Sequence, residues 1–164
     1  MVRHLTLDRY DYDTPPATDD RDPASLIEAA VAGVLERAEG WLGWDGRPVA
    51  RSGNAWTPHK AMRRVCDHLL DHLAELECRL AGRPTVPDRW HGRMVTTEAD
   101  FARFTEVDLD EATSRLTRLA ACYRTRLSVV DDGALDAVPA EGGWTLRQML
   151  HHVAQVGVYA DLLG

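Results

Sequence analysis

The amino-acid sequence predicts an all-α protein that folds as an antiparallel four-helix bundle. Four segments place apolar residues at the three- and four-residue spacing of amphipathic helices, and residues typical of helix ends bound each segment. There is little of the alternating pattern expected of strands. The length of 164 residues favours one domain with its own core. We therefore expect a single domain over 1–164, with an extended N-terminal arm at 1–22 and the bundle at 23–164.

The first predicted helix follows the arm in the sequence DPASLIEAAVAGVLERAEG. Asp22, followed by proline, opens this helix, and Gly40 can end it. Ser25 and Glu28 have the spacing of a capping box. Residues 40–55 are rich in glycine and contain two tryptophans, so we expect a structured loop pinned by buried indole rings.

The second predicted helix has the clearest boundaries. Thr57 caps it, apolar residues recur through Leu80, and Gly82 stops it. A long connection between helices two and three follows at 83–107, with a short helical turn expected after the sequence TTEAD. The sequence leaves open whether this connection covers the cleft between the helices as a lid.

The third predicted helix lies in DLDEATSRLTRLAACYRTRL, with Asp108 as its cap and Glu111 three residues later. The sequence VVDDGALDAVPAEGG predicts a loop, and WTLRQMLHHVAQVGVYADLL predicts the fourth helix. The segments WTPHKAMRRV (56–65) and WTLRQMLHHV (144–153) both begin with Trp-Thr and have Val nine residues after the tryptophan. The second and fourth helices are therefore expected to enter the bundle in the same way.

Composition and charge argue against several classes of protein. A formal net charge of −7 disfavours non-specific binding to nucleic acid or to anionic membrane surfaces. No apolar run approaches the ~18 residues of a spanning helix, and the N-terminal sequence does not resemble a signal peptide. Cys66, Cys78 and Cys122 form an odd set, usual in a reduced cytosolic protein, and we expect all three to be buried. These features predict a cytoplasmic protein without nucleic-acid or membrane partners.

Three histidines on two predicted helices carry the strongest indication of chemistry. His68 and His72 are four residues apart, so their rings stack on one helix face beside the apolar stripe. His152 flanks the stripe of the fourth helix, whereas His151 is turned toward water. Because the stripes face each other in a bundle, the three imidazoles border one cleft. Three histidine ligands with an open coordination position are typical of a catalytic metal site.

Other polar residues have simpler interpretations. A histidine at the edge of an apolar stripe is usually a solvated or hydrogen-bonded surface residue, and we assign that role to His4, His59, His91 and His151. Charged residues of the second helix are expected to be solvated or paired on its surface: Arg63, Arg64, Asp67, Asp71, Glu75 and Glu77. Tyr159 lies about two turns beyond His152 on the same flank. It is a candidate for donating a proton or orienting a substrate, or alternatively a packing residue.

The two helix sequences WTPHKAMRRVCDHLLDHLAELECRLAG and WTLRQMLHHVAQVGVYADLLG resemble the DinB-like superfamily of bacterial four-helix bundles. In that family, a helix opening with Trp-Ser/Thr carries a histidine eight residues after the tryptophan, and another helix carries His-x-x-x-His. Trp144 with His152 matches the first motif, and His68 with His72 matches the second. The family usually has these helices in the opposite order along the chain. The resemblance covers about 56–164 and implies that these three histidines bind a divalent metal, commonly zinc or nickel.

The resemblance also implies a range of functions. Characterised members look like thiol-dependent transferases or isomerases, in which the metal holds a low-molecular-weight thiol as its thiolate. We therefore expect a small-molecule substrate and a transferase or hydrolase step in which the ion acts as a Lewis acid on water or a thiol. One alternative is an enzyme of the mycothiol-dependent isomerase branch. The other is a non-catalytic helical module that forms a homodimer and binds no metal.

Overall fold

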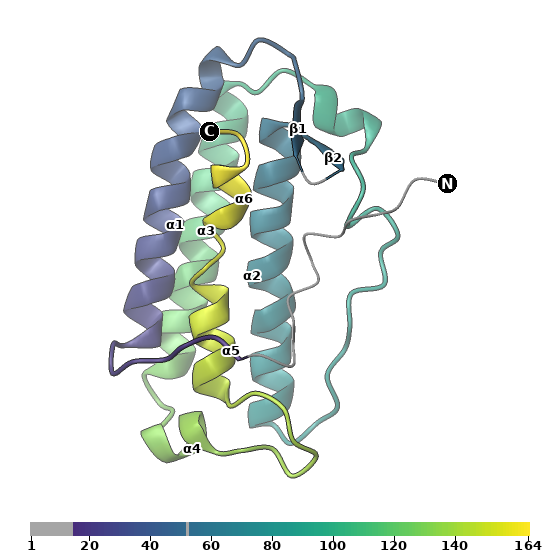
Figure 1. Cartoon of the computed structure of the whole chain (residues 1–164). Helices are drawn as coiled ribbons and strands as arrows, with labels where there is room; N and C mark the ends of the chain where they lie inside the picture. Colours follow the sequence, from purple (N-terminus) through teal and green to yellow (C-terminus); the bar gives the residue numbers. More distant parts are fainter. Residues whose placement is uncertain (1–14, 52) are drawn as a thin grey trace.

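A computed structural model describes residues 15–51 and 53–164 of the chain. This part is mostly helical with one small two-stranded sheet, which confirms the predicted class at that level (Figure 1). Most of the predicted arm lies outside the described residues, and 15–22 form neither helix nor strand. The α-helices, 3-10 helices and strands are α1 (Pro23–Glu39), η1 (Gly40–Gly43), β1 (Val49–Arg51), β2 (Asn54–Trp56), α2 (Pro58–Leu80), η2 (Glu98–Phe101), α3 (Glu106–Leu127), α4 (Asp132–Asp136), α5 (Leu146–Val153) and α6 (Val158–Asp161).

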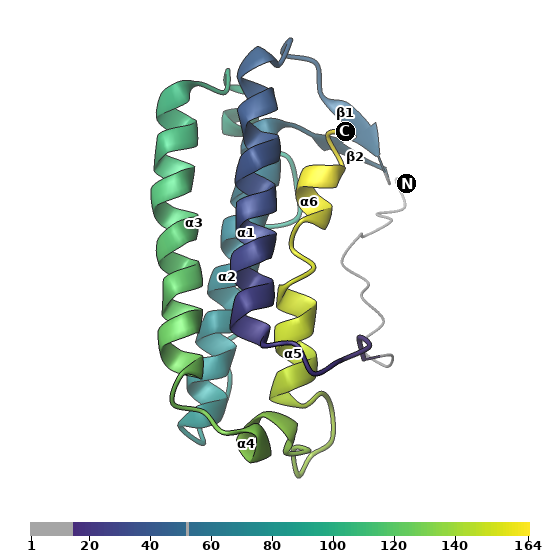
Figure 2. The ribbon, with the colours of Figure 1, turned by 90° about the vertical axis from the view of Figure 1, so that its left-hand side faces the viewer.

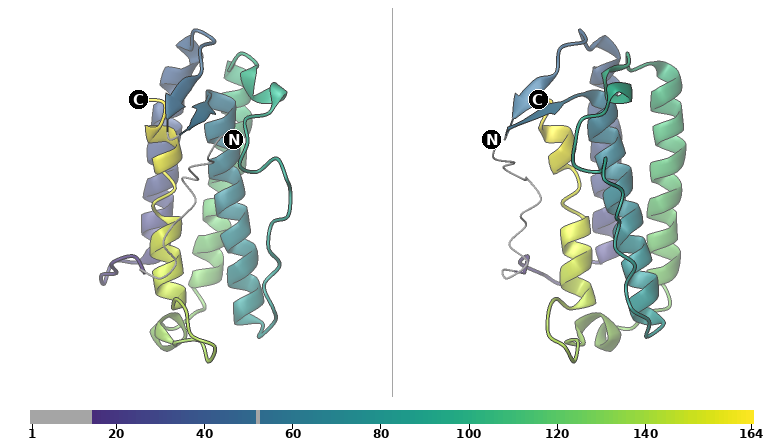
Figure 3. Two further views of the ribbon diagram at one scale, coloured as in Figure 1. Left: turned by 45° about the vertical axis from the view of Figure 1, so that its right-hand side comes forward. Right: turned by 90° about the vertical axis from the view of Figure 1, so that its right-hand side faces the viewer.

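The long helices and the C-terminal helical segment lie side by side (Figures 1 and 2). α1 and the C-terminal segment run in one direction, and α2 and α3 run in the other. α2 and α3 share a direction because the connection after α2 returns along the side of that helix to the end where it began (Figure 3). The consecutive helices α2 and α3 are therefore parallel, unlike the antiparallel arrangement that the sequence predicted. The connection between them lies beside α2 (Figure 3).

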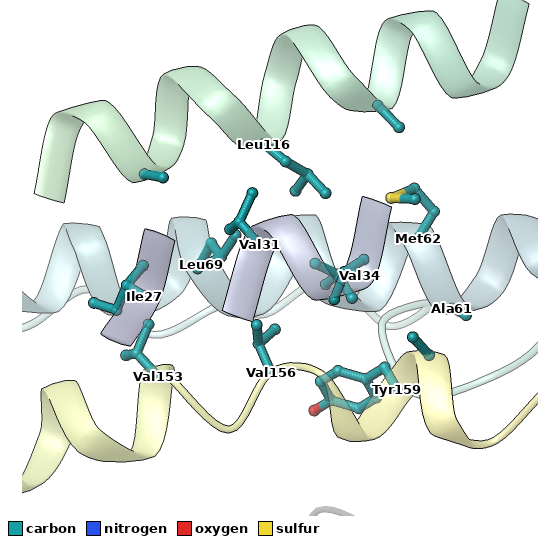
Figure 4. Close-up of a cluster of buried hydrophobic side chains, with 14 of the residues drawn as sticks. Ile27, Val31, Val34, Ala61, Met62, Leu69, Leu116, Val153, Val156 and Tyr159 are labelled. Atoms are coloured by element: carbon teal, nitrogen blue, oxygen red, sulfur yellow. The ribbon is translucent and has the colours of Figure 1, made fainter. Parts of the chain in front are cut away.

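The hydrophobic core lies between these helical segments (Figure 4). Burial of each aliphatic side chain there contributes about 1.5–3 kcal/mol, so the core can hold the fold without a disulfide. All three cysteines are free, and Cys122 is exposed rather than buried as predicted, while Cys66 and Cys78 are half-buried. The fully buried or nearly buried aliphatic residues include Ile27, Val31, Val34, Leu69, Leu116, Val153 and Val156.

The start of α1 corrects one sequence-based prediction. Asp22 is the N-cap, and its carboxylate accepts hydrogen bonds from backbone N–H groups of the first turn, including that of Ser25 at 3.1 Å. The predicted capping box between Ser25 and Glu28 is wrong, because Ser25 already lies inside the helix. Glu28 instead accepts a hydrogen bond from Arg124 of α3 at 3.0 Å, which joins the two helices.

α3 likewise begins earlier than predicted. Thr105 is its N-cap, and Asp108 lies at the third helical position, where its carboxylate accepts the backbone N–H of Thr105 at 2.7 Å. Asp108 is therefore the second member of a capping box, not the cap. Two pairs have the three-residue spacing of a capping box here, namely Thr105 with Asp108 and Asp108 with Glu111. Spacing alone therefore does not show which pair begins α3.

Residues 40–55, predicted as a loop, include most of a short hairpin. β1 pairs with β2 in antiparallel register, with Val49 opposite Trp56. The strands have three residues each, which is too short for an alternating pattern to be recognised. Trp41 does pin this region as predicted, because it is buried and its ring lies 5.7 Å from that of Phe104.

α2 has the predicted boundaries. Thr57 is its N-cap, and the helix ends at Leu80. Gly82 follows with φ of 62°, a left-handed conformation that glycine adopts without strain. The connection after α2 contains a short helical turn, η2, but it lies largely within TTEAD and not after it, and Thr97 caps it.

The predicted fourth helix is interrupted. Residues 154–157 form a turn between α5 and α6. Its backbone hydrogen bonds join residues three apart, such as that from Gln155 N–H to the carbonyl of His152 at 2.9 Å, instead of four apart as in an α-helix. Gly157 and the valines on either side of it have low helix propensity, which explains the break. The loop predicted before this helix also needs correction, because it contains the short helix α4.

Among the helices of the described residues, none is both long enough and apolar enough to span a bilayer.

Candidate metal centre

Three histidine side chains from α2 and α5 converge on one point. Potential ligand atoms of His68, His72 and His152 all lie within 4.8 Å of one another. The ring centroids are 4.7 Å apart for His68 and His72, 4.7 Å for His68 and His152, and 5.0 Å for His72 and His152. The structure therefore brings together the three residues that the sequence singled out as metal ligands.

This cluster fits the donor set of a divalent metal. The nitrogen ligands of a tetrahedral zinc ion, each at 2.0–2.1 Å, lie about 3.4 Å apart. One potential ligand atom of each of the three rings lies within 4.8 Å of the others, which is close to that separation. The two α2 rings are mostly buried, and His152 is only 2% exposed, so little water competes for the ligand atoms.

Burial also keeps two of the three imidazoles, those of His68 and His152, in their neutral form. Burial, followed by the neighbouring His72, lowers the pKa of His152 to about 4. Burial, together with His72, His152 and Arg64, lowers the pKa of His68 well below its usual value. Both rings are therefore neutral at pH 7, and neutral imidazole is the metal-binding form.

Glu75 fixes the orientation of His72. The Nδ1 of His72 lies 2.9 Å from Oε2 of Glu75, so an ionised Glu75 accepts a hydrogen bond from Nδ1–H. The lone pair of Nε2 then stays available to bind a metal ion. Burial raises the pKa of Glu75, but the hydrogen bond from His72 and the charge of Arg79 outweigh this effect, so the pKa lies below its usual value. The prediction of a solvated Glu75 is wrong, although its position one turn after His72 was a signal that could have revealed the contact.

Arg79 connects this pair to the start of α5. Its Nη1 donates to Glu75 at 3.4 Å, and its Nη2 donates to the carbonyl oxygen of Trp144 at 2.8 Å. The Trp144 ring also lies 5.4 Å from that of His152. The contacts of Arg79 and Trp144 therefore hold the two helices that supply the three histidines in a fixed relation.

Tyr159 and Arg64 form the other side of the site. Tyr159 is 4% exposed, with its ring 5.9 Å from that of His68 and stacked on Trp56 at 6.0 Å. Nη2 of Arg64 donates to the Tyr159 hydroxyl at 3.3 Å. The predicted surface position of Arg64 is wrong, because contact with α6 leaves it only 3% exposed. Asp67 forms an ion pair with Arg64, with 3.7 Å between Nη1 and Oδ2.

The remaining histidines do not join the cluster. His59 lies against Phe104, and His91 is exposed, while His4 lies outside the described residues. His151 is buried at 6% exposure instead of facing water. Burial lowers the pKa of His151, whereas the charge of Asp19, in the segment that crosses α5 before α1 begins, acts to raise it (Figure 2).

A cavity of about 220 Å³ opens onto the three histidines. Part of its wall comes from the connection after α2, namely Thr85, Val86, Pro87, Asp88 and Arg93. The connection therefore forms one side of this cavity. It is anchored to α2 further along, where Arg63 donates to Asp100 at 2.6 Å and Lys60 donates to Thr96 at 2.8 Å.

The chain matches no family model, no curated protein and no solved structure. The resemblance to the DinB-like superfamily therefore stays a prediction based on the two histidine motifs and their tryptophans.

Proposed function

We propose that this protein is a metal-dependent enzyme that binds one divalent ion, zinc or nickel, through His68, His72 and His152. The observation that carries the proposal is the convergence of three imidazoles from two helices at the wall of one cavity. Three protein ligands leave a coordination position open, as in catalytic rather than structural sites. When bound, such an ion supplies Lewis acidity, which lowers the pKa of a coordinated water or thiol.

The residues around the site fit a reaction on a small molecule. Glu75 holds His72 in one tautomer, and the connection after α2 supplies part of the cavity wall against which a small molecule could bind. Tyr159 lines the same cavity and is our candidate for the group that donates a proton to the substrate or orients it. The reaction class is a transferase that uses a low-molecular-weight thiol, or a metal-assisted hydrolase.

The proposal extends to the fold family and the location of the protein. We infer a DinB-like four-helix bundle in which α5 and α6 together form the fourth, interrupted helix. Support comes from the parallel starts of α2 and α5, since Thr57 and Thr145 both cap a helix directly after a tryptophan. Three free cysteines are consistent with a cytoplasmic protein.

Metal analysis of protein purified without a histidine tag tests the proposal. After zinc or nickel is offered and excess is removed, we expect about one ion per chain and a higher melting temperature. His152→Ala should abolish both effects, while His91→Ala, which alters an exposed histidine, should preserve them. If the unaltered protein retains no metal and its melting temperature does not respond, the non-catalytic homodimer becomes the better interpretation.

A further inference from the structure

A second, larger cavity lies next to the one that the three histidines line. Its volume is about 480 Å³, and pockets that hold small molecules typically have about 300–1,000 Å³. His72, Glu75 and Thr85 line both cavities, so the second one begins at the proposed metal site. A molecule whose reacting group lies at the ion can therefore place the rest of its body in the second cavity.

The walls of this second cavity come from three segments of the chain. They are the end of α2, the start of the connection that follows it, and the turn before α5, which meet at one end of the molecule (Figure 1). Arg79 joins α2 to that turn, because its Nη2 donates to the carbonyl oxygen of Trp144 at 2.8 Å. The contact that holds α5 beside α2 therefore also fixes these walls relative to each other.

The inner wall of the second cavity is apolar. Met149 is only 1% exposed there, and Pro139 and Trp144 are half-buried. Gly142 and Gly143 form the turn between them with φ of 81° and 102°, values that favour glycine. Neither glycine brings a side chain into the cavity, and no neighbouring heavy atom lies within 4 Å of the place that a Cβ would take. The turn therefore leaves this space open to a ligand.

The charged residues that line the second cavity are either bound to each other or at its outer edge. Glu75 is bound by His72 and Arg79, at 2.9 and 3.4 Å. Arg83 and Glu141 are exposed, so water stabilises their charges. Burial against an apolar wall is costly for an ion and favourable for a hydrocarbon group. The inner wall therefore favours an uncharged, apolar ligand.

We propose that the second cavity binds an uncharged hydrocarbon body of the substrate, while the reacting group of the same substrate lies at the three histidines. Each methylene that is buried there should tighten binding about fourfold. The inference rests on the proposed function. It describes the small-molecule substrate of that function as an amphiphile, with a metal-binding head and an apolar tail.

NMR of protein labelled with 13C in its methionine methyl groups tests the contact with the tail. Zinc-loaded protein is titrated with hexanohydroxamic acid, which has a zinc-binding head and an apolar chain, and with acetohydroxamic acid, which has the same head and a single methyl group. Met149→Leu assigns the Met149 signal by removing it. We expect nuclear Overhauser contacts between the chain and the Met149 methyl group, and at least about tenfold tighter binding of the longer compound.

Met62 provides the matched control. It is also a buried methionine of a helix, but it lines a different cavity. Met149→Gln should reduce the preference for the longer hydroxamate at least about threefold, because it places a polar amide in the wall, whereas Met62→Gln should leave that preference unchanged. Equal affinities of the unaltered protein for the two hydroxamates, or chain contacts to Met62 and none to Met149, would overturn the inference.

Hexanol separates this inference from the proposed function, because it has the apolar chain without the hydroxamate head. Contacts from hexanol to the Met149 methyl group, in protein that retains no zinc after zinc is offered, would support the apolar cavity and remove the metal site. Bound zinc with hydroxamate affinities that do not depend on chain length would overturn the apolar cavity and leave the metal site standing.

Discussion

His72 makes a hydrogen bond to Glu75, one helical turn further along α2, and Glu75 in turn accepts from Arg79. These three side chains form a line that ends at the backbone of Trp144, just before α5. A histidine held through Nδ1 presents Nε2 in one direction, and the carboxylate makes that ring a better metal ligand. In the proposed site, we therefore expect the affinity for an ion to depend on residues that do not touch it.

Replacement of Glu75 tests this dependence. Glu75→Gln keeps the shape of the side chain and removes its charge, so we expect zinc affinity to fall about 10–100-fold. Competition with a chromophoric chelator measures the change. Glu77→Gln is the matched control, because Glu77 is paired with Arg126 of α3 instead of a histidine. Equal affinities in both variants would show that the Glu75 contact has no influence on the site.

The buried imidazoles also predict how stability depends on pH. The pKa of His152 lies near 4 in the folded chain against a usual value of 6.5. Between these values the unfolded chain binds more protons, so the metal-free protein loses stability as the pH falls from 6.5 toward 4. Urea unfolding should show a shallower loss in His152→Gln than in the unaltered protein. Identical pH profiles would contradict the neutral, buried state of this ring.

At the scale of elements, α5 is short for the role it has. It has eight residues, too few to be stable alone, yet it carries His152. Its start is secured by a capping box, in which the Gln148 N–H donates to Thr145 Oγ1 at 3.2 Å and the Thr145 N–H donates to Gln148 Oε1 at 2.9 Å. The cap therefore helps to keep a proposed metal ligand in place.

Loss of this cap should reduce both stability and metal affinity. Thr145→Ala is expected to lower the free energy of unfolding by about 1 kcal/mol and to weaken zinc binding. Thr113→Ala, in which an exposed mid-helix threonine of α3 is changed, should stay within about 0.5 kcal/mol of the unaltered protein. Urea denaturation with and without zinc measures both quantities. A Thr145→Ala protein as stable as the Thr113→Ala control would contradict the account of α5.

The boundaries of α2 and the three candidate ligands were predictable because their signals are local. A threonine cap, a glycine stop and the four-residue spacing of His68 and His72 all lie within or next to α2, and His152 was singled out from the apolar stripe of its own helix. The break between α5 and α6 was missed because apolar periodicity continues through residues 154–157, although the backbone changes there. Helical periodicity thus predicts which face is buried better than it predicts whether the helix is continuous.

At the scale of the whole molecule, the missed residues depend on contacts between distant parts of the chain. Arg64 reaches its tyrosine partner across 95 positions of sequence, and the charge of Asp19, before α1, acts on the buried His151 of α5. A residue at the edge of a helix stripe is exposed or buried according to what packs beside it, which its own helix does not encode. The position of the long connection also depends on distant parts of the chain. It runs back along α2 to the start of α3 (Figure 3), and on this path it supplies part of the cavity wall.

The central claim is that three imidazoles from two helices hold one ion. A crystal structure of zinc-loaded protein, with anomalous diffraction data collected on both sides of the zinc absorption edge, tests it most directly. We predict one strong anomalous peak at about 2.0–2.1 Å from a nitrogen of each of His68, His72 and His152. Strong zinc peaks elsewhere and none between these three rings would contradict it.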